Sequence, residues 1–374
     1  MKFKTMTLLS VVLALGAFAD AQTYSESILY NFGSSASDGS PSSGLVMDSG
    51  GNLYGSDGSN ESGYGEIYKL TPNGVKSTFH AFTGGSGGST SGWLTIDSSG
   101  NIYGTTWDGG NGYGTIFKIT SSGAYSILHK FGKNGSGDGQ TPSGPVTIDS
   151  SGNLYGATYY GGGGYGTVFE ITAAGKETVL YKFKGGRSGY SPSNNLIRDG
   201  QGNLYGISCA TVAVYCAGFE VFKLTPQGVK SLVARLDSVN DGSFIARNSL
   251  GNFYGYNYWN GFWEIDAQGV NSFGFGWAYG TEFRGRLMFS GGILYGTSAG
   301  GGANANFDFY GDGVAYAYDP ATNIDTVLYN FGASSTDAAW PISGVIMDSA
   351  GNLYGASYLG GSYGLGTVFK LTKE

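Results

Sequence analysis

The sequence predicts an all-β fold, and more narrowly a seven-bladed β-propeller built from four-stranded antiparallel blades. Glycine contributes 69 of the 374 residues and Tyr and Phe contribute 28 and 22, which favours turns and strands over helices. Hydrophobic residues make up 40% of the chain, which is more core material than a disordered segment carries. One phrase recurs seven times, and such recurrence indicates a repeat architecture.

The phrase is Gly-Asn-hydrophobic-Tyr-Gly, and it marks the second of four strand-like segments in each copy. Its tyrosine stands at Tyr54, Tyr103, Tyr155, Tyr205, Tyr254, Tyr295 and Tyr354. First strands are expected at 41–48, 142–149 and 341–348, third strands at 115–120, 167–172 and 367–372, and fourth strands at 127–131, 179–183 and 327–331. Gly, Asn, Asp, Ser or Pro bound these segments, as expected of strands in a meander.

The two ends of the repeat region predict a closed ring. A four-stranded sheet that is apolar on both faces needs a neighbour on each side. The seventh copy stops after its third strand, and a fourth-strand sequence stands instead at residues 28–32. We expect this N-terminal strand to complete the last blade and close the ring, which leaves no open junction.

The segment Asp-Ser-Ser-Gly-Asn between the first and second strands predicts a tight turn. Asp and Asn side chains bond the nearby backbone, and Gly permits positive φ. The turn position is held by Asp48, Asp97, Asp149, Asp199 and Asp348, with Asn248 in the fifth copy. Each turn has one acidic residue, whereas a calcium loop needs several. We interpret the repeated tyrosines as blade packing rather than ligand contacts.

The first 21 residues predict a signal peptide. Lys2 and Lys4 precede an apolar run from Leu8 to Phe18, and a small-x-small pattern ends at Ala21. Cleavage after Ala21 would leave residues 22–374 as a single propeller domain, exported and either secreted or associated with the cell surface. No later run of about 20 apolar residues predicts a membrane span.

Charge and cysteine content restrict the partners. A net charge of −7 disfavours nucleic acid and anionic membranes. Cys209 and Cys216 are expected to form a disulfide that clamps a hairpin, as is usual in exported proteins. Two cysteines and two histidines are too few ligands to predict a metal site. No cofactor is expected, and the protein is expected to be monomeric.

The long, variable loops of one face carry the candidate ligand-binding aromatics, because variable loops usually carry function. These candidates are Trp93, Trp107, Tyr159, Tyr160, Trp340 and Tyr358. Flat rings beside Gly-rich backbone suit stacking on sugar rings or holding an extended polymer. The alternative is that each ring folds back over a blade edge. The sixth copy adds an insertion at 298–313, which would cap the channel mouth or serve as an ornament.

Charged residues that occur once in the repeat are the second set of candidates. Arg198 and Arg247 replace an apolar residue in consecutive first strands, so both are candidates for the channel wall. The other non-repeating charges are Arg187, Arg235, Glu282, Arg284 and Arg286. The alternative for all of them is pairing with local acids. His80 and His129 stand where other copies have tyrosine, so both are interpreted as aromatic substitutes in outer strands. No catalytic residue is predicted.

The phrases G-N-L-Y-G, G-G-x-x-G-Y-G-T-V-F-x-L-T and L-Y-x-F-G resemble the Gloeo/Verruco tandem repeat of exported bacterial proteins, the choice-of-anchor tandem repeat proteins, over residues 24 to 372. The resemblance implies an exported, surface-associated repeat protein. The chain ends at Lys373-Glu374 without the sorting segment that often follows in such proteins, which favours secretion over anchoring.

The predicted function is a non-enzymatic binding protein for a glycan, a cell-envelope component or another protein. The alternatives are a propeller-type lyase or hydrolase acting at the channel mouth and a purely structural surface protein.

Overall fold

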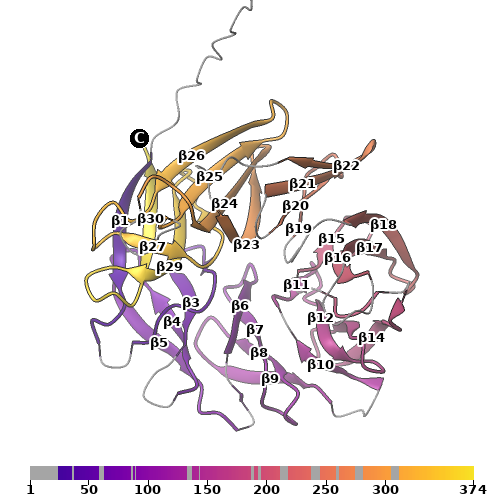
Figure 1. Cartoon of the computed structure of the whole chain (residues 1–374). Coiled ribbons are helices and arrows are strands. Elements are labelled where there is room, and N and C mark those ends of the chain that lie inside the picture. Colours follow the sequence, from indigo (N-terminus) through magenta and orange to yellow (C-terminus); the bar gives the residue numbers. More distant parts are fainter. Residues whose placement is uncertain are drawn as a thin grey trace, which may run out of the picture.

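The chain folds into seven antiparallel sheets that follow one another in sequence order around a common centre (Figure 1), so the predicted seven-bladed β-propeller is confirmed. The computed structural model describes residues 24–374 apart from 36–37, 59–62, 86, 89, 133–136, 143, 187–188, 193–194, 211–217, 237–244, 258–260, 274–280 and 305–310. The predicted signal peptide lies outside this range. Within it, no helix is long and apolar enough to span a membrane.

Blades 1 to 4 are the sheets that follow β1 along the chain. Blade 1 holds β2 (Val46–Met47), β3 (Leu53–Asp57), β4 (Glu66–Leu70) and β5 (Lys76–Ala81). Blade 2 holds β6 (Thr90–Ile96), β7 (Ile102–Thr106), β8 (Thr115–Ile119) and β9 (Tyr125–Lys130). Blade 3 holds β10 (Gly139–Pro142), β11 (Thr147–Ile148), β12 (Leu154–Gly161), β13 (Thr167–Ile171) and β14 (Glu177–Lys182). Blade 4 holds β15 (Ile197–Arg198), β16 (Leu204–Cys209), β17 (Phe219–Leu224) and β18 (Lys230–Leu236).

Blades 5 to 7 complete the set. Blade 5 holds β19 (Ile245–Arg247), β20 (Phe253–Asn257), β21 (Gly261–Asp266) and β22 (Gly269–Phe273). Blade 6 holds β23 (Thr281–Ser290), β24 (Ile293–Gly300), β25 (Val314–Asp319) and β26 (Ile324–Asn330). Blade 7 holds β27 (Ala338–Pro341), β28 (Ile346–Met347), β29 (Leu353–Gly360), β30 (Thr367–Lys373) and β1 (Tyr24–Asn31). In blades 3 and 7 the first strand is split into two short strands.

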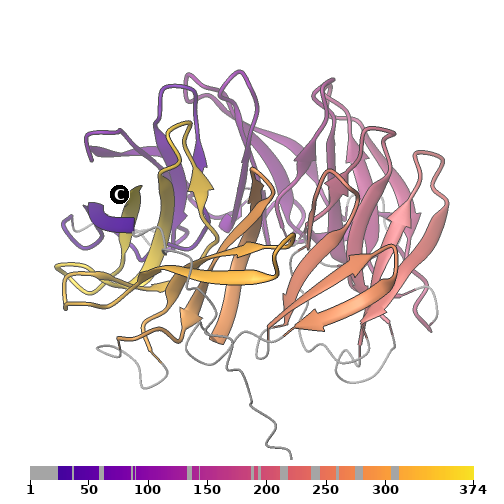
Figure 2. The same cartoon turned by 90° about the horizontal axis from the view of Figure 1, so that it is seen from above.

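The N-terminal strand lies in the sheet of the C-terminal one. β1 pairs antiparallel with β30, from Tyr24 opposite Lys373 to Asn31 opposite Thr367. Figure 1 shows this as the indigo start of the chain beside its yellow end. Figure 2, turned by 90°, shows the strands running between two faces on which the connecting loops lie.

The core is divided among the blade junctions. Seven clusters of buried apolar side chains each draw on two neighbouring blades, because every sheet is apolar on both faces. The cluster between blades 7 and 1 joins Phe32, Tyr68 and Val368, all fully buried.

The predicted Asp turns form as expected. In blade 2, Asp97 Oδ1 accepts hydrogen bonds from the backbone N–H groups of Ser99 and Asn101, both at 2.9 Å. Its Oδ2 accepts one from Tyr103 Oη at 3.1 Å. Asp48, Asp149, Asp199 and Asp348 do the same in their own blades. Burial raises the pKa of these carboxyls, but the accepted hydrogen bonds outweigh it, so each pKa lies below its usual value.

Candidate functional site

The loops between the second and third strands of blades 7, 1, 2 and 3 carry the exposed aromatic side chains. In the described part of the chain, every exposed Tyr, Phe or Trp lies in these loops or at the strand ends that lead into them: Tyr64, Trp107, Tyr113, Tyr159, Tyr160, Tyr165, Tyr358 and Tyr363. Loops at the same position in each blade lie on one face of a propeller. We call this set the aromatic arc.

Four tyrosines of the arc rest on glycines. A Cβ added to Gly132 would lie 2.2 Å from the ring of Tyr113, and one added to Gly84 would lie 2.4 Å from that of Tyr64. A Cβ added to Gly185 would lie 2.9 Å from the ring of Tyr165, and one added to Gly33 would lie 2.8 Å from the Cβ of Tyr363 and 3.4 Å from its ring. Each glycine follows a fourth strand, so each ring covers the end of its own blade. The rings are nevertheless 37 to 58% exposed, which leaves much of each ring surface open to solvent.

Backbone contacts with the next blade hold two of these loops in place. The N–H of Thr141 donates to the carbonyl of Tyr113 at 2.8 Å, and that of Ser191 donates to the carbonyl of Tyr165, also at 2.8 Å. Thr141 and Ser191 have φ of +57° and +46°, a conformation that is costly for residues other than glycine. Strain is therefore concentrated where the next blade fixes the loop, and the rings are held before any ligand arrives.

Four of the predicted ligand-binding residues belong to the arc, namely Trp107, Tyr159, Tyr160 and Tyr358. Tyr159 and Tyr160 contact each other edge to face, with 4.7 Å between ring centroids. Trp340 is half-buried in β27 of blade 7, where its backbone N–H donates to the carbonyl of Asp312 in blade 6. Trp93 does not join the arc, because it lies in the central channel.

Sequence reasoning missed Tyr64, Tyr113, Tyr165 and Tyr363. The available signal was the recurrence of Gly-Tyr-Gly before three of the third strands. This signal does not indicate that the rings are exposed, because the place of each ring depends on a glycine that follows a different strand.

The central channel is lined by the first strands of the blades, which side chains tie together. Thr95 Oγ1 donates to the carbonyl of Val146 at 2.6 Å, and Asn195 Nδ2 donates to that of Ile245 at 2.9 Å. Tyr256 Oη donates to the carbonyl of Gly285 at 2.9 Å in the same way. Each bond joins one blade to the next, so the channel wall is built as a rigid frame.

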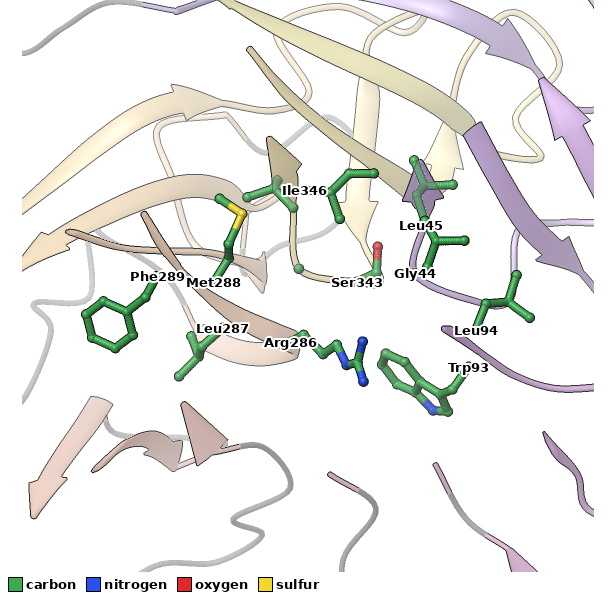
Figure 3. A pocket seen from close by; sticks show the side chains of 13 residues that line it. Gly44, Leu45, Trp93, Leu94, Arg286, Leu287, Met288, Phe289, Ser343 and Ile346 are labelled. Atoms are coloured by element: carbon green, nitrogen blue, oxygen red, sulfur yellow. The ribbon is translucent and has the colours of Figure 1, made fainter. Parts of the chain in front are cut away.

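A cavity of about 360 Å³ lies in this channel against blades 6, 7, 1 and 2 (Figure 3). Each of the four blades contributes one residue at the same register position. In each first strand, this residue stands two positions before the one that pairs with the repeated tyrosine. These residues are Arg286, Gly344, Gly44 and Trp93. The two glycines leave space between the larger side chains, and the remaining walls are mostly apolar, including Leu45, Leu94, Met288 and Ile346. Ser343 adds a buried hydroxyl that makes no hydrogen bond within the described chain.

Bulges place Arg286 and Trp93 at this cavity. In β23, Arg284 pairs with Thr297 and Met288 pairs with Tyr295, so three residues face only Gly296. β6 has the same irregularity between Thr90 and Leu94. A bulge bends its strand and re-aims the side chains within it. Figure 3 shows the Arg286 guanidinium directed toward the Trp93 ring.

Arg286 is a cation in surroundings that do not balance its charge. Among the described residues no carboxylate lies within 4 Å of it, and its buried Nε makes no hydrogen bond. Burial lowers the pKa of Arg286 to about 10, which still leaves the guanidinium charged at neutral pH.

The two predicted channel-wall arginines occupy different surroundings. Arg247 lines a second cavity of about 290 Å³ that Arg286 shares, and its guanidinium carbon lies 5.1 Å from the centroid of the Tyr205 ring. Arg198 instead lies over the Tyr155 ring at 5.3 Å and 3.9 Å from Asp149. Its side chain is paired locally.

His129 joins two carboxylates at the junction of blades 2 and 3. Its Nε2 lies 3.7 Å from Asp138 Oδ1 and 3.6 Å from Glu177 Oε2. The corresponding place between blades 7 and 1 holds Tyr30 and Asp38, whose oxygens are 2.8 Å apart. The nitrogen and two carboxylates are donor types that bind divalent metal ions. The other histidine, His80, stacks on Tyr125 with ring centroids 3.9 Å apart, as an aromatic substitute would.

Several predicted features fall outside the described residues. Cys209 is buried at the end of β16, but Cys216 lies in an undescribed segment, as do Arg187 and residues 305–310 of the insertion. Asp312, at the far end of the insertion, is fully buried.

Comparison with known proteins identifies a family and a fold. The profile of the Gloeobacter/Verrucomicrobia repeat matches residues 56–262, more than half of the chain. No curated protein matches. Among solved structures, the chain is similar to virginiamycin B lyase from Staphylococcus aureus, with a TM-score of 0.63, 15% identity, and coverage of 94% of this chain and 99% of that one.

Two further structures have the same fold. A streptogramin B lyase matches with a TM-score of 0.65 and 15% identity, covering 95% of this chain and all of its own. The extracellular domain of a hybrid two-component system from B. thetaiotaomicron matches with a TM-score of 0.60 and 10% identity, covering 94% of this chain and 40% of that one. Identities this low support the fold alone.

Proposed function

We propose that this chain, which belongs to the Gloeobacter/Verrucomicrobia repeat family, is an exported binding protein that holds a neutral polysaccharide on the aromatic arc. Export is supported by the leader-like N-terminal sequence, and one structural relative is itself an extracellular domain. The mature chain would be residues 22–374, a monomeric propeller with Cys209 and Cys216 joined by a disulfide.

The observation that carries the proposal is that the exposed aromatics of the described chain are gathered on one set of loops. Soluble proteins rarely gather exposed apolar side chains on one surface unless the surface binds something. The rings rest on glycine, and two of the loops are anchored to the next blade, so little conformational entropy remains to be lost on binding.

The repetition of platforms favours a polymer over a small ligand. Successive blades present equivalent rings, and a chain of repeating sugars would meet several of them at once. Each contact is weak, but linked contacts multiply in their effect on affinity. A polysaccharide also matches flat rings and polar loop backbone, which together bind the apolar faces and hydroxyls of sugars.

Charge favours a neutral polymer. The chain carries a net charge of −7, and no Lys or Arg belongs to the arc. A polyanion would meet the overall negative charge of the chain. The partner is therefore a neutral glucan-like or mannan-like chain rather than an acidic one.

A lyase or hydrolase at the channel mouth is the second candidate, and the central cavity is the feature that bears on it. Proton transfer in such reactions usually uses His, Asp, Glu or Lys. None of these is among the described residues that line the two channel cavities. This composition supports binding over catalysis.

The test is retention of the purified protein by neutral and acidic polysaccharides in affinity electrophoresis. We expect retardation by soluble β-glucan or mannan and none by polygalacturonate. Trp107→Ala and Tyr113→Ala should each weaken retention several-fold, and the double variant more. Leu250→Ala is the matched control, because Leu250 is 85% exposed in a turn between first and second strands. Equal retention of the unmodified protein, the two single arc variants and the double variant would contradict the proposal. Retention by the acidic polymer alone would also contradict it.

A further inference from the structure

We infer that the central channel holds a second, separate site, for a small organic acid whose carboxylate pairs with Arg286 and whose apolar body fills the cavity beside Trp93. The inference is independent of polysaccharide binding, since the arc and the channel share no residue.

Arg286 lacks a counter-charge. Its side chain is partly buried, and taking part of a guanidinium out of water is costly unless an anion or well-placed acceptors compensate it. Two buried lysines meet this requirement: Lys230 lies 2.5 Å from Glu220, and Lys76 lies within 4 Å of three carboxylates. Arg247 also has a buried Nε without a hydrogen bond in the described part of the chain, but its guanidinium lies over the rings of Tyr205 and Phe253. Arg286 has no such carboxylate partner among the described residues. A bound anion from solution would therefore neutralise the charge of Arg286.

Close backbone packing around Gly285 holds the neighbouring Arg286 at the cavity. Gly285 has φ of +82°, and a Cβ there would lie 1.9 Å from the backbone nitrogen of Gly344 in the next blade. Tyr256 of blade 5 bonds the carbonyl of Gly285 from the other side. The bulge is therefore fixed between two blades. Bulges that aim a side chain in this way are common next to binding sites.

The walls of the cavity specify the rest of the ligand. Leu45, Leu94, Met288 and Ile346 offer no polar side-chain atoms, and Trp93 offers a flat apolar surface. A volume of about 360 Å³ lies within the usual range of small-molecule sites. One cation balances a monoanion, and a guanidinium matches a carboxylate through two parallel hydrogen bonds. A phosphate dianion would need several further donors, whereas the described walls add at most the Ser343 hydroxyl and the Trp93 indole N–H.

The repeat shows why only this sector of the channel forms the site. The residues at the shared register position are Arg286, Gly344, Gly44 and Trp93 in four consecutive blades. Two adjacent glycines open the space, and the two bulky residues bound it. Neither glycine position has room for a larger side chain. A Cβ on Gly44 would lie 3.3 Å from the Cβ of Ser343, and one on Gly344 would lie 1.8 Å from the carbonyl oxygen of Arg286.

The experiment is isothermal titration of the purified protein with three monocarboxylates, namely 3-phenylpropanoate, indole-3-acetate and hexanoate, and with the amide of each. We expect saturable one-to-one binding of at least one acid, with its amide at least tenfold weaker. Arg286→Met should reduce the affinity for the acid to that for the amide. Arg198→Met is the matched control and should change nothing, because Arg198 is paired with Asp149 outside the cavity.

Three results would overturn the inference: no saturable binding by any acid, equal affinity for an acid and its amide, or undiminished binding by Arg286→Met. Inorganic phosphate that bound as tightly as the best acid would also overturn it, because the apolar walls would then contribute nothing. If Arg286→Met does not fold, the comparison of acid with amide on the unmodified protein decides alone. Gly44→Ala, which narrows the cavity but keeps the charge, should weaken acid and amide alike.

Discussion

Asp57 and Glu66 lie directly opposite one another in β3 and β4, at the register position where blade 2 pairs Thr106 with Thr115. In blade 2 the two hydroxyls hydrogen-bond at 2.8 Å. In blade 1 the two buried carboxylates share Lys76 instead, whose Nζ lies 3.2 Å from Asp57, 2.7 Å from Glu66 and 2.8 Å from Asp38. One lysine cannot neutralise three carboxylates, so a proton is expected to remain in this cluster.

The first prediction is that this cluster makes stability fall as pH rises. Burial raises the pKa of Asp57 to about 7; Lys76 opposes the rise and Glu66 adds to it. Because the folded pKa lies above the unfolded value of 3.8, the contribution of Asp57 is complete below about pH 4 and is lost as pH rises through 7. Urea unfolding at pH 5.5 and 8.5 should show a loss of about 1–3 kcal/mol in the unmodified protein and a smaller loss in Asp57→Asn.

Glu220→Gln is the control for this prediction. Glu220 forms a one-to-one pair with Lys230, so its removal leaves an unbalanced lysine and should destabilise the protein at both pH values. A pH dependence that is unchanged in Asp57→Asn would show that another group causes it.

The second prediction concerns the Asp turns. Asp97→Ala removes the acceptor of four hydrogen bonds and should lower the free energy of unfolding by about 1–3 kcal/mol at pH 7. Asp97→Asn should cost less, because Asn248 accepts the same two backbone bonds in blade 5. The folded pKa of Asp97 is lowered, so its contribution is present above about pH 4 and lost as pH falls through the folded value. The difference between the unmodified protein and Asp97→Ala should therefore shrink in acid, and a constant difference would contradict this account.

The third prediction separates backbone strain from ring contact in the aromatic arc. Gly132 and Gly112 have φ of +77° and +88°, so alanine strains both positions by about 1 kcal/mol. A Cβ at Gly132 would also strike the Tyr113 ring, whereas one at Gly112 meets nothing within 4 Å. Thermal unfolding should show Gly132→Ala to be the more damaging change, and only Gly132→Ala should reduce polysaccharide retention.

A double variant checks the cause. With Tyr113 already replaced by alanine, Gly132→Ala should cost no more than Gly112→Ala does, because the colliding ring is gone. An undiminished cost in the double variant would mean that the ring is not what constrains Gly132.

The sequence was informative about the fold because each blade repeats its own local code. In six of the seven copies an Asp or Asn stands six residues before the repeated tyrosine, so one interpretation of this turn and of the strand after it applies to all six. The register of bulges has no such local signal. Arg286 and Trp93 both lie in irregular segments, because β23 and β6 each carry two extra residues, which the alternation of apolar residues does not indicate.

Contacts between strands have no such local signal either. From its own strand His129 is an aromatic substitute, whereas the structure shows that its Nε2 lies near Asp138 and Glu177. Four tyrosines of the arc depend in the same way on another strand, since each contacts a glycine that follows the fourth strand of its own blade.

The last prediction is that Phe32 holds the N-terminal strand in place. Its side chain is fully buried, its ring contacts Tyr68 edge to face at 5.4 Å, and its N–H donates to the carbonyl of Gly366 at 3.0 Å. Phe131 occupies the same place after β9, also fully buried, but its strand is held by chain on both sides. Phe32→Ala and Phe131→Ala should each cost about 3–5 kcal/mol of stability. Only Phe32→Ala should also speed hydrogen exchange across residues 24–31, because Phe32 directly follows β1, an outer strand that pairs with β30 and can detach while the other blades stay folded. Equal exchange of β1 in the two variants would show that its pairing with β30 alone keeps it in place.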